Sequence, residues 1–80
     1  MIYLKRIHDF REGHNLTQAH MAQLLGVAQN TYSQYEWGER PLPLDYFIYL
    51  CKYFEVSADY LLGFTDENRS PFKSPSGRKF

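Results

Sequence analysis

The sequence contains one cysteine, no long apolar run and no excess of charge of either sign. Because Cys51 has no second cysteine to pair with, an internal disulfide is excluded and a reducing compartment is favoured. No segment approaches the roughly 18 apolar residues that a membrane-spanning helix requires. The first ten residues also lack the apolar core of a signal peptide. We therefore expect a cytoplasmic protein without a membrane segment.

Patterns typical of metal sites and of catalysis are also missing. His8, His14 and His20 do not share a helical face, and no Cys or His pair has the spacing of a zinc site. Cys51 lies among apolar residues, where burial keeps a thiol unreactive. So small a chain leaves little room for a catalytic cleft. We expect neither enzyme activity, nor a cofactor, nor a bound metal.

The chain length suits one small domain. Its 80 residues would bury only about 60% of the surface of the unfolded chain, so bulky core side chains are needed. Seven Tyr, six Phe and one Trp supply them. The formal net charge is zero, which is low for a protein that binds phosphates. The basic stretch is 64–80, where Arg69, Lys73, Arg78 and Lys79 outnumber the acidic residues, and its Ser, Pro and Gly content predicts a flexible tail.

Apolar residues recur at helical spacing throughout, and no strand-like alternation occurs. Thr17 and Ser57 suit the N-caps of helices. Gly26, Gly38 and Gly63 suit helix C-termini. We therefore predict an all-α, compact five-helix bundle ahead of the tail. The predicted helices are Tyr3–Glu12, Gln18–Leu25, Gln29–Trp37, Leu44–Phe54 and Ala58–Leu62.

The fourth predicted helix carries two sets of bulky side chains. One set has core spacing and is expected to be buried: Leu44, Phe47, Ile48, Cys51 and Phe54. The other is a stripe of Tyr46, Tyr49 and Tyr53 beside it. This stripe suits either a self-association face, where aromatics are enriched, or tyrosines that pack sideways with their hydroxyls in water.

The third predicted helix has uncharged hydrogen-bonding side chains on its outer face: Gln29, Asn30, Ser33 and Gln34. Tyr32 and Tyr35 point to the opposite side. Amides and hydroxyls both donate and accept, and an Asn or Gln amide can pair with N6 and N7 of adenine. We predict that these four outer side chains contact base edges in the major groove of DNA. The alternative is an ordinary polar helix surface.

Five segments occur in a characteristic order. They are LTQ at 16–18, LLGV at 24–27, QNTYSQYE at 29–36, GERPLPLD at 38–45 and VSADYLLG at 56–63. Together they resemble the lambda-repressor-like helix-turn-helix family, also called the Cro/repressor or XRE type. The resemblance implies that residues 1–63 form a DNA-binding domain that reads the major groove with its third helix. It also implies a homodimer on a two-fold symmetric operator of double-stranded DNA, and a transcriptional regulator, more often a repressor.

The resemblance further implies roles for single residues. Gln18 matches a glutamine that contacts a backbone phosphate, and Thr31 fits a phosphate contact beside the helix. Arg40 suits either a phosphate contact or simple solvation. Arg11 and Glu36 match a pair that in some relatives forms a partly buried ion bridge. Such a bridge would position the reading helix rather than contact DNA.

Five residues depart from the family pattern. Ala28 replaces the usual Ser or Thr cap of the third helix, and His20 replaces the Glu of a capping box. Leu24 stands where a polar residue is common. Trp37 and Glu39 occupy positions that are often basic or small and polar. With the zero net charge and the tyrosine stripe, these last two favour an alternative, a protein-interaction module without DNA binding. A third hypothesis, which still includes DNA binding, is the antitoxin half of a toxin pair.

Overall fold

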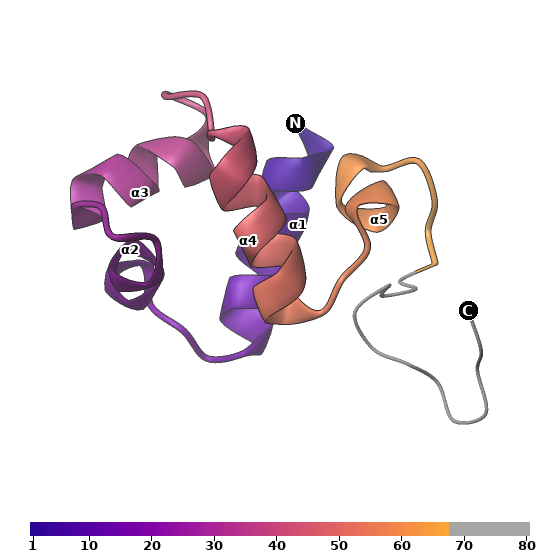
Figure 1. The fold of residues 1–80 in the computed structure, drawn as a ribbon, viewed down its shortest axis with the longest axis horizontal. Helices are drawn as coiled ribbons and strands as arrows, with labels where there is room; N and C mark the ends of the chain where they lie inside the picture. The colour runs from indigo at the N-terminus through magenta and orange to yellow at the C-terminus, as the bar shows by residue number, and fades with distance from the viewer. Residues whose placement is uncertain (68–80) are drawn as a thin grey trace.

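The computed structural model describes residues 1–67, which form five α-helices and contain no strand (Figure 1). The helices are α1 (Ile2–Gly13), α2 (Gln18–Leu25), α3 (Gln29–Trp37), α4 (Leu44–Phe54) and α5 (Ala58–Leu62). The prediction of an all-α five-helix fold is confirmed, and α2 to α5 have the predicted bounds. Helix α1 extends one residue beyond the predicted range at each end.

Local side-chain chemistry explains where α2 and α5 begin. Thr17 Oγ1 accepts a hydrogen bond from the His20 N–H at 3.1 Å, and Ser57 Oγ accepts one from the Tyr60 N–H at 3.1 Å. Each bond satisfies a backbone donor that has no partner within its helix. Helix α2 ends where Gly26 adopts a φ of 71°, a left-handed conformation that glycine takes without strain.

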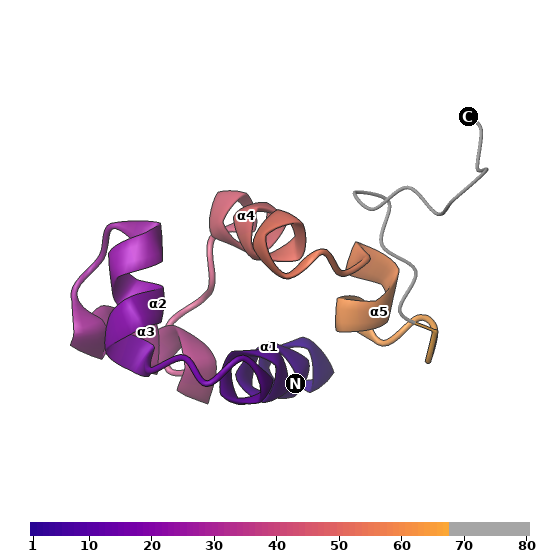
Figure 2. The ribbon, with the colours of Figure 1, turned by 90° about the horizontal axis from the view of Figure 1, so that it is seen from below.

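The helices enclose one core. Helices α1 and α4 lie on opposite sides of it, with the α2–α3 pair at one end and α5 at the other (Figures 1 and 2). The most deeply buried side chains, each at most 2% exposed, come from all five helices and the α4–α5 link: Ile7, Met21, Tyr32, Leu50, Val56 and Leu61. Burying a side chain of this size stabilises the fold by about 1.5–3 kcal/mol. This core fixes α2 and α3 relative to α1.

The predicted core face of α4 is wrong at two positions. Leu44 is 69% exposed and Ile48 is 43% exposed, whereas Leu50, absent from the prediction, is fully buried. Successive residues turn by about 100° around a helix, so positions 44 and 48 share a side with the exposed Lys52. The buried stripe consists of Phe47, Leu50, Cys51 and Phe54. Helix α4 has bulky apolar residues on almost every side, so spacing alone selects the wrong stripe.

The chain just after α5 is held against α1 by Arg6. The Arg6 Nη1 atom donates to the backbone oxygens of Tyr60 and Thr65, the latter at 3.1 Å, and the guanidinium stacks 4.1 Å from the centre of the Tyr60 ring. Arg6 Nη2 also lies 3.2 Å from Asp66 Oδ1. The first residues of the predicted tail thus contact the bundle. The flexibility predicted for the rest of the tail concerns residues 68–80, which lie outside the described part of the chain.

Candidate functional site

Helices α2 and α3 are joined by a tight turn and pack directly against each other. The Val27 N–H donates to the Ala22 oxygen at 3.0 Å, which closes the turn after Gly26. Helix α3 then begins after Ala28, whose methyl group cannot cap it. Substitution of a capping side chain by Ala typically costs about 1 kcal/mol, so α3 depends on its packing rather than on its cap. Its inner face supplies Tyr32 and Tyr35 to the core.

The outer face of α3 lines a shallow hollow of about 560 Å³. The lining residues are Gln18 from α2, then Gln29, Asn30, Ser33 and Gln34 from α3, and Glu39 from the segment that follows. The structure therefore brings together the four side chains predicted to contact bases, and it adds Gln18 beside them. Thr31 is partly exposed on α3 but does not line the hollow. Apart from Glu39, every lining side chain is uncharged.

Arg40 contacts the hollow indirectly, through Gln34. Its Nε–H donates to Gln34 Oε1 at 3.0 Å. The backbone supports this contact, because the N–H groups of Glu39 and Arg40 both donate to the Gln34 carbonyl oxygen, at 2.8 and 3.2 Å. The chain can turn back towards Gln34 because Gly38 adopts a φ of 78° at the end of α3. Arg40 is exposed, so the rest of its guanidinium can reach a ligand.

On the other side of α3 from the hollow lies a buried carboxylate, Glu36, with donors from three helices. Arg11 Nε and Tyr32 Oη donate to Glu36 Oε2 at 2.9 and 2.7 Å. The other oxygen, Oε1, accepts from Arg11 Nη2 at 3.1 Å, from His8 Nδ1 at 3.0 Å and from Gln18 Nε2 at 3.0 Å. The structure thus brings Arg11 and Glu36 into a bidentate pair. We call these five residues the Glu36 cluster.

The Glu36 cluster ties α1 and α2 to α3. Arg11 also donates through Nη1 to the Leu16 oxygen at 2.8 Å, so it holds the α1–α2 connection as well. Gln18 belongs both to this cluster and to the hollow. Its amide nitrogen carries a second N–H, which remains available to an acceptor outside the protein. A ligand in the hollow would therefore meet a donor whose orientation is set by a buried carboxylate.

The cluster perturbs the titration of its members. Burial by itself would raise the pKa of Glu36, but the hydrogen bonds from Arg11, His8, Tyr32 and Gln18 outweigh it and lower the pKa from 4.5 to about 2. The hydrogen bond to Glu36 raises the pKa of His8. Burial, followed by the bond to Glu36, raises the pKa of Tyr32. At neutral pH Glu36 is therefore ionised although it is only 8% exposed.

The lowered pKa predicts a loss of stability in acid. The ionised form of Glu36 stabilises the fold fully above its ordinary pKa of 4.5, and this contribution disappears as the pH falls towards the folded-state pKa of about 2. We expect Glu36→Gln to be less stable than the wild type at pH 7, with a difference that shrinks between pH 4.5 and pH 2. Urea unfolding at several pH values measures this difference. A difference that stays constant over that range would show that Glu36 ionisation does not stabilise the fold.

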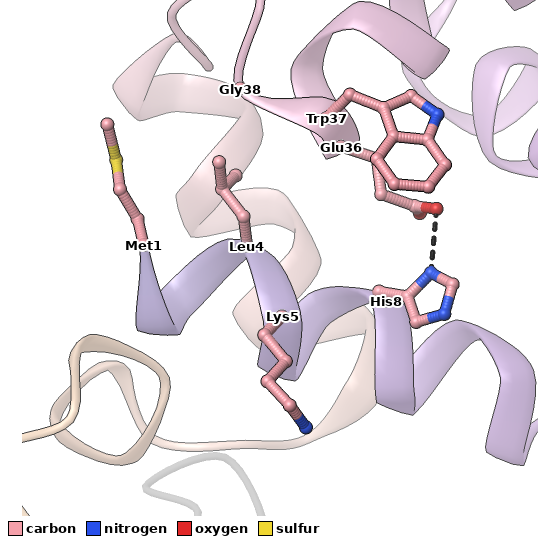
Figure 3. Close-up of a pocket in the computed structure, with 7 residues that line it drawn as sticks. All are labelled: Met1, Leu4, Lys5, His8, Glu36, Trp37 and Gly38. Carbon is pink, nitrogen blue, oxygen red and sulfur yellow. Dashed lines mark hydrogen bonds and ion pairs between the residues drawn. The ribbon is translucent and has the colours of Figure 1, made fainter.

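A second hollow of about 460 Å³ lies between the start of α1 and the end of α3 (Figure 3). His8 points from α1 to the Glu36 carboxylate, while the Lys5 side chain points away from both. Lys5 instead pairs with Asp9 at 3.0 Å. Trp37 lies over this hollow and is 68% exposed. Of the Glu36 cluster, His8 and Glu36 line this hollow.

Sequence reasoning missed three contacts of Glu36, from His8, Tyr32 and Gln18, and also the position of Glu39 beside the first hollow. His8 lies one turn before Arg11, and Tyr32 lies one turn before Glu36, so helical spacing around the expected ion pair could have indicated both. The bond from Gln18 to Glu36 joins two helices, and local spacing gives no signal for it. Glu39 reaches the hollow only because the chain turns back at Gly38.

Two negative findings concern residues 1–67. No group of three or more His, Cys, Asp or Glu side chains in this part of the chain could hold a metal ion. None of its helices combines the length and the apolar content that crossing a bilayer requires. Cys51, the predicted core cysteine, is 3% exposed, and burial raises the pKa of its thiol. That burial accords with a structural role for the cysteine.

Comparisons with known proteins point to one family. A family model for helix-turn-helix domains matches residues 7–61. YobD of Bacillus subtilis (strain 168), described as an uncharacterized HTH-type transcriptional regulator, is 36% identical over 66 residues, which cover 82% of this chain and 59% of YobD. RstR of Vibrio cholerae, the transcriptional repressor of the cryptic phage CTXphi, is 34% identical over 67 residues, covering 81% of this chain and 60% of RstR.

The antitoxin PezA of Streptococcus pneumoniae is 32% identical over 59 residues, covering 74% of this chain and 37% of PezA. This chain therefore matches between 37% and 60% of the length of these three relatives. No solved structure matches it significantly. The family model covers well over half of the chain, and its match includes the whole of α2, the turn and α3. The protein belongs to the lambda-repressor-like, XRE-type helix-turn-helix family.

Proposed function

We propose that the protein is a transcriptional regulator that binds double-stranded DNA by inserting α3 into the major groove. The observation that carries this proposal is the hollow on the outer face of α3, where three amides and a hydroxyl face outwards from one helix. These groups match the donors and acceptors on base edges, and a major groove is wide enough to admit a helix. The names of YobD and RstR, both regulators of transcription, support the same function.

The residues would have three roles: base contacts, phosphate contacts and support of α3. Gln29, Asn30, Ser33 and Gln34 would contact base edges from the hollow. Gln18, Thr31 and Arg40 would contact phosphates, which set the position of the protein on the duplex. The pair of Arg11 and Glu36 would hold α3 at the correct angle without touching DNA.

We also propose that the protein acts as a homodimer on a two-fold symmetric operator. The half-sites would then lie about 34 Å apart, one helical turn of DNA. Helix α4 offers exposed apolar side chains for self-association, among them Leu44, Ile48, Tyr49 and Tyr53. The rings of Tyr49 and Tyr53 lie nearly parallel with their centres 6.3 Å apart, so two partly exposed aromatic side chains are adjacent on this helix. Repression is the regulatory outcome that the name of RstR favours.

Selection from randomised duplex DNA at low salt tests the proposal. A regulator of this kind should enrich one sequence with two-fold symmetry. Sedimentation of the protein alone and with the enriched duplex gives its stoichiometry. If no sequence is enriched, or if the protein does not bind DNA, the proposed function is wrong.

Replacing Gln29 by Ala should weaken binding to the selected sequence by about 1–3 kcal/mol and relax the preference at one base pair. Gln29 is exposed in the hollow, so the loss reflects a missing base contact rather than damage to the core. Gln23→Ala is the matched control, because Gln23 is an exposed glutamine on α2 outside the hollow. Fluorescence anisotropy with the selected duplex and its single-base variants measures both effects. If both variants had the same affinity and the same base preferences, Gln29 would not contact a base.

An antitoxin or another protein-interaction module on the same fold is the second candidate. It is favoured by the similarity to PezA, by Glu39 in the hollow and by the exposed Trp37. Salt distinguishes the two functions, because DNA binding releases counterions and weakens steeply as the salt concentration rises. An aromatic protein interface should respond little to salt. An affinity for DNA that does not change with salt would therefore favour this second candidate.

A further inference from the structure

We infer that His8 is a pH-sensitive clamp: as an imidazolium cation between the carboxylates of Glu12 and Glu36 it holds α3 against α1, and loss of its proton weakens this attachment. The positions of its two ring nitrogens and of the charges around them carry this assignment. The clamp goes beyond the proposed function and does not depend on DNA binding. It acts on α3, the helix that carries most of the side chains lining the first hollow.

Each ring nitrogen of His8 faces a carboxylate oxygen. Nδ1 lies 3.0 Å from Glu36 Oε1 on α3, and Nε2 lies 3.2 Å from Glu12 Oε1 on α1. An ionised carboxylate can only accept hydrogen bonds, so each nitrogen needs a proton to bond its partner. Neutral imidazole has one N–H, whereas the imidazolium has two. The geometry therefore fits the positively charged ring, which can make both bonds at once.

Arg11 offers the His8 ring a poorer alternative. Its Nη2 atom lies 3.3 Å from His8 Nδ1, and a bond between them would require Nδ1 to accept. Arg11 Nη2 already donates to Glu36 Oε1 at 3.1 Å. An unprotonated Nδ1 would also direct its lone pair at this same oxygen, 3.0 Å away. Nδ1 therefore keeps its proton in the neutral ring, and the proton that leaves is the one on Nε2, which faces Glu12.

The charges around the ring balance when it is protonated. The charged side chains that face His8 come from α1 and α3: Arg11, Glu12 and Glu36. With the protonated ring this group has two positive and two negative charges, whereas the neutral ring leaves one negative charge in excess. Lys5 points away from His8 and pairs with Asp9 at 3.0 Å, so it does not supply the missing charge (Figure 3). Tyr32, which also bonds Glu36, stays neutral because burial raises its pKa.

The direction in which the pKa of His8 moves agrees with this arrangement. The hydrogen bond to Glu36 raises the pKa above 6.5, and the negative charges of Glu36 and Glu12 add to the effect, against partial burial and the positive charge of Arg11. A histidine with a raised pKa stabilises the fold fully below pH 6.5, and this contribution is lost as the pH rises through the folded-state pKa. The neutral ring keeps one bond to Glu36, but charge-assisted hydrogen bonds are roughly twice as strong as neutral ones.

Ring ¹⁵N–¹H spectra of the full chain, recorded from about pH 5.5 to 9, test the clamp because they show which ring nitrogens carry protons. At pH 6.5 both nitrogens of His8 should be protonated in most molecules, with a titration midpoint above 6.5. Glu12→Gln should lower this midpoint, because it removes the charge beside Nε2 and nearly keeps the size of the side chain. Asp45→Asn is the matched control, since it removes a negative charge on α4 that does not act on His8.

Urea unfolding of the wild type and of His8→Gln connects the proton to stability. Glutamine still offers a donor near Glu36, but it has no proton to lose in this pH range. From pH 6.5 to 9 the ratio of folded to unfolded protein should fall in the wild type relative to this variant. The expected fall is about tenfold for each pH unit by which the His8 midpoint exceeds 6.5. Circular dichroism verifies that each variant is folded.

Three results would overturn the clamp. A His8 midpoint at or below pH 6.5 would mean that the folded protein does not favour the cation. An unchanged midpoint in Glu12→Gln would mean that Nε2 is not held by Glu12. A stability difference between the wild type and His8→Gln that is the same at pH 6.5 and pH 9 would mean that the proton does not strengthen the attachment of α3. None of these measurements involves DNA, so the proposed function is tested separately.

Discussion

Replacement of Arg11 by Met is expected to lower the free energy of unfolding by about 3–5 kcal/mol, the range found when a buried charge loses its partner. The Arg11 side chain is 11% exposed and that of Glu36 is 2% exposed, so water cannot compensate for the lost guanidinium. The substitution also removes the bond from Arg11 to the Leu16 oxygen, which holds the connection into α2. For a domain near the lower end of the usual 5–15 kcal/mol of stability, such a loss unfolds an appreciable fraction of the molecules, about 3% or more.

Urea unfolding followed by circular dichroism measures the loss. Lys5→Met is the matched control. Lys5 also pairs with an acidic residue, Asp9 on the same helix, but the Lys5 side chain is 75% exposed. Exposed pairs contribute about 1 kcal/mol or less. If Arg11→Met cost no more than Lys5→Met, Glu36 would not depend on Arg11, and the Glu36 cluster would not hold α3 in place.

Leu50→Ala is expected to destabilise the protein by about 2–5 kcal/mol, whereas Leu44→Ala should change its stability by about 0.5 kcal/mol or less. The two substitutions are chemically identical and lie on the same helix. Leu50 is fully buried, so its removal leaves a cavity, while Leu44 is 69% exposed and leaves none. Thermal and urea unfolding of both variants compare them directly.

The comparison of Leu50 with Leu44 tests the rotation of α4 about its axis. Equal losses would mean that both leucines are partly buried. A larger loss at Leu44 would restore the core face that apolar spacing predicts. Either outcome would also count against the proposed dimer surface, because that surface consists of exposed side chains on α4: Leu44, Ile48, Tyr49 and Tyr53.

The sequence predicted the helices well because their ends carry local signals. Thr17 and Ser57 cap α2 and α5 as expected, and Gly26 and Gly38 end α2 and α3 in the left-handed conformation. Such signals act over three or four residues, so they can be recognised without knowing the fold. The face that α4 buries has no comparable signal, since its choice depends on which other helices surround it.

The candidate site was predictable only in part, for the same reason. The outer face of α3 follows from its helical period, and the structure places its four polar side chains around one hollow. The bond between Gln18 and Glu36 joins α2 to α3, and the bond between Arg40 and Gln34 depends on the turn at Gly38. Contacts of this kind arise from tertiary packing.

The central claim is that the outer face of α3 meets DNA, and side-chain amide resonances test it most directly. The NH₂ groups of Gln29, Asn30 and Gln34 give separate signals in a ¹⁵N–¹H spectrum, and exposed Gln23 on α2 gives one outside the hollow. On titration with the selected duplex, the three signals from α3 should shift while that of Gln23 stays in place. Binding that shifts Gln23 and leaves the three α3 amides unchanged would contradict the account.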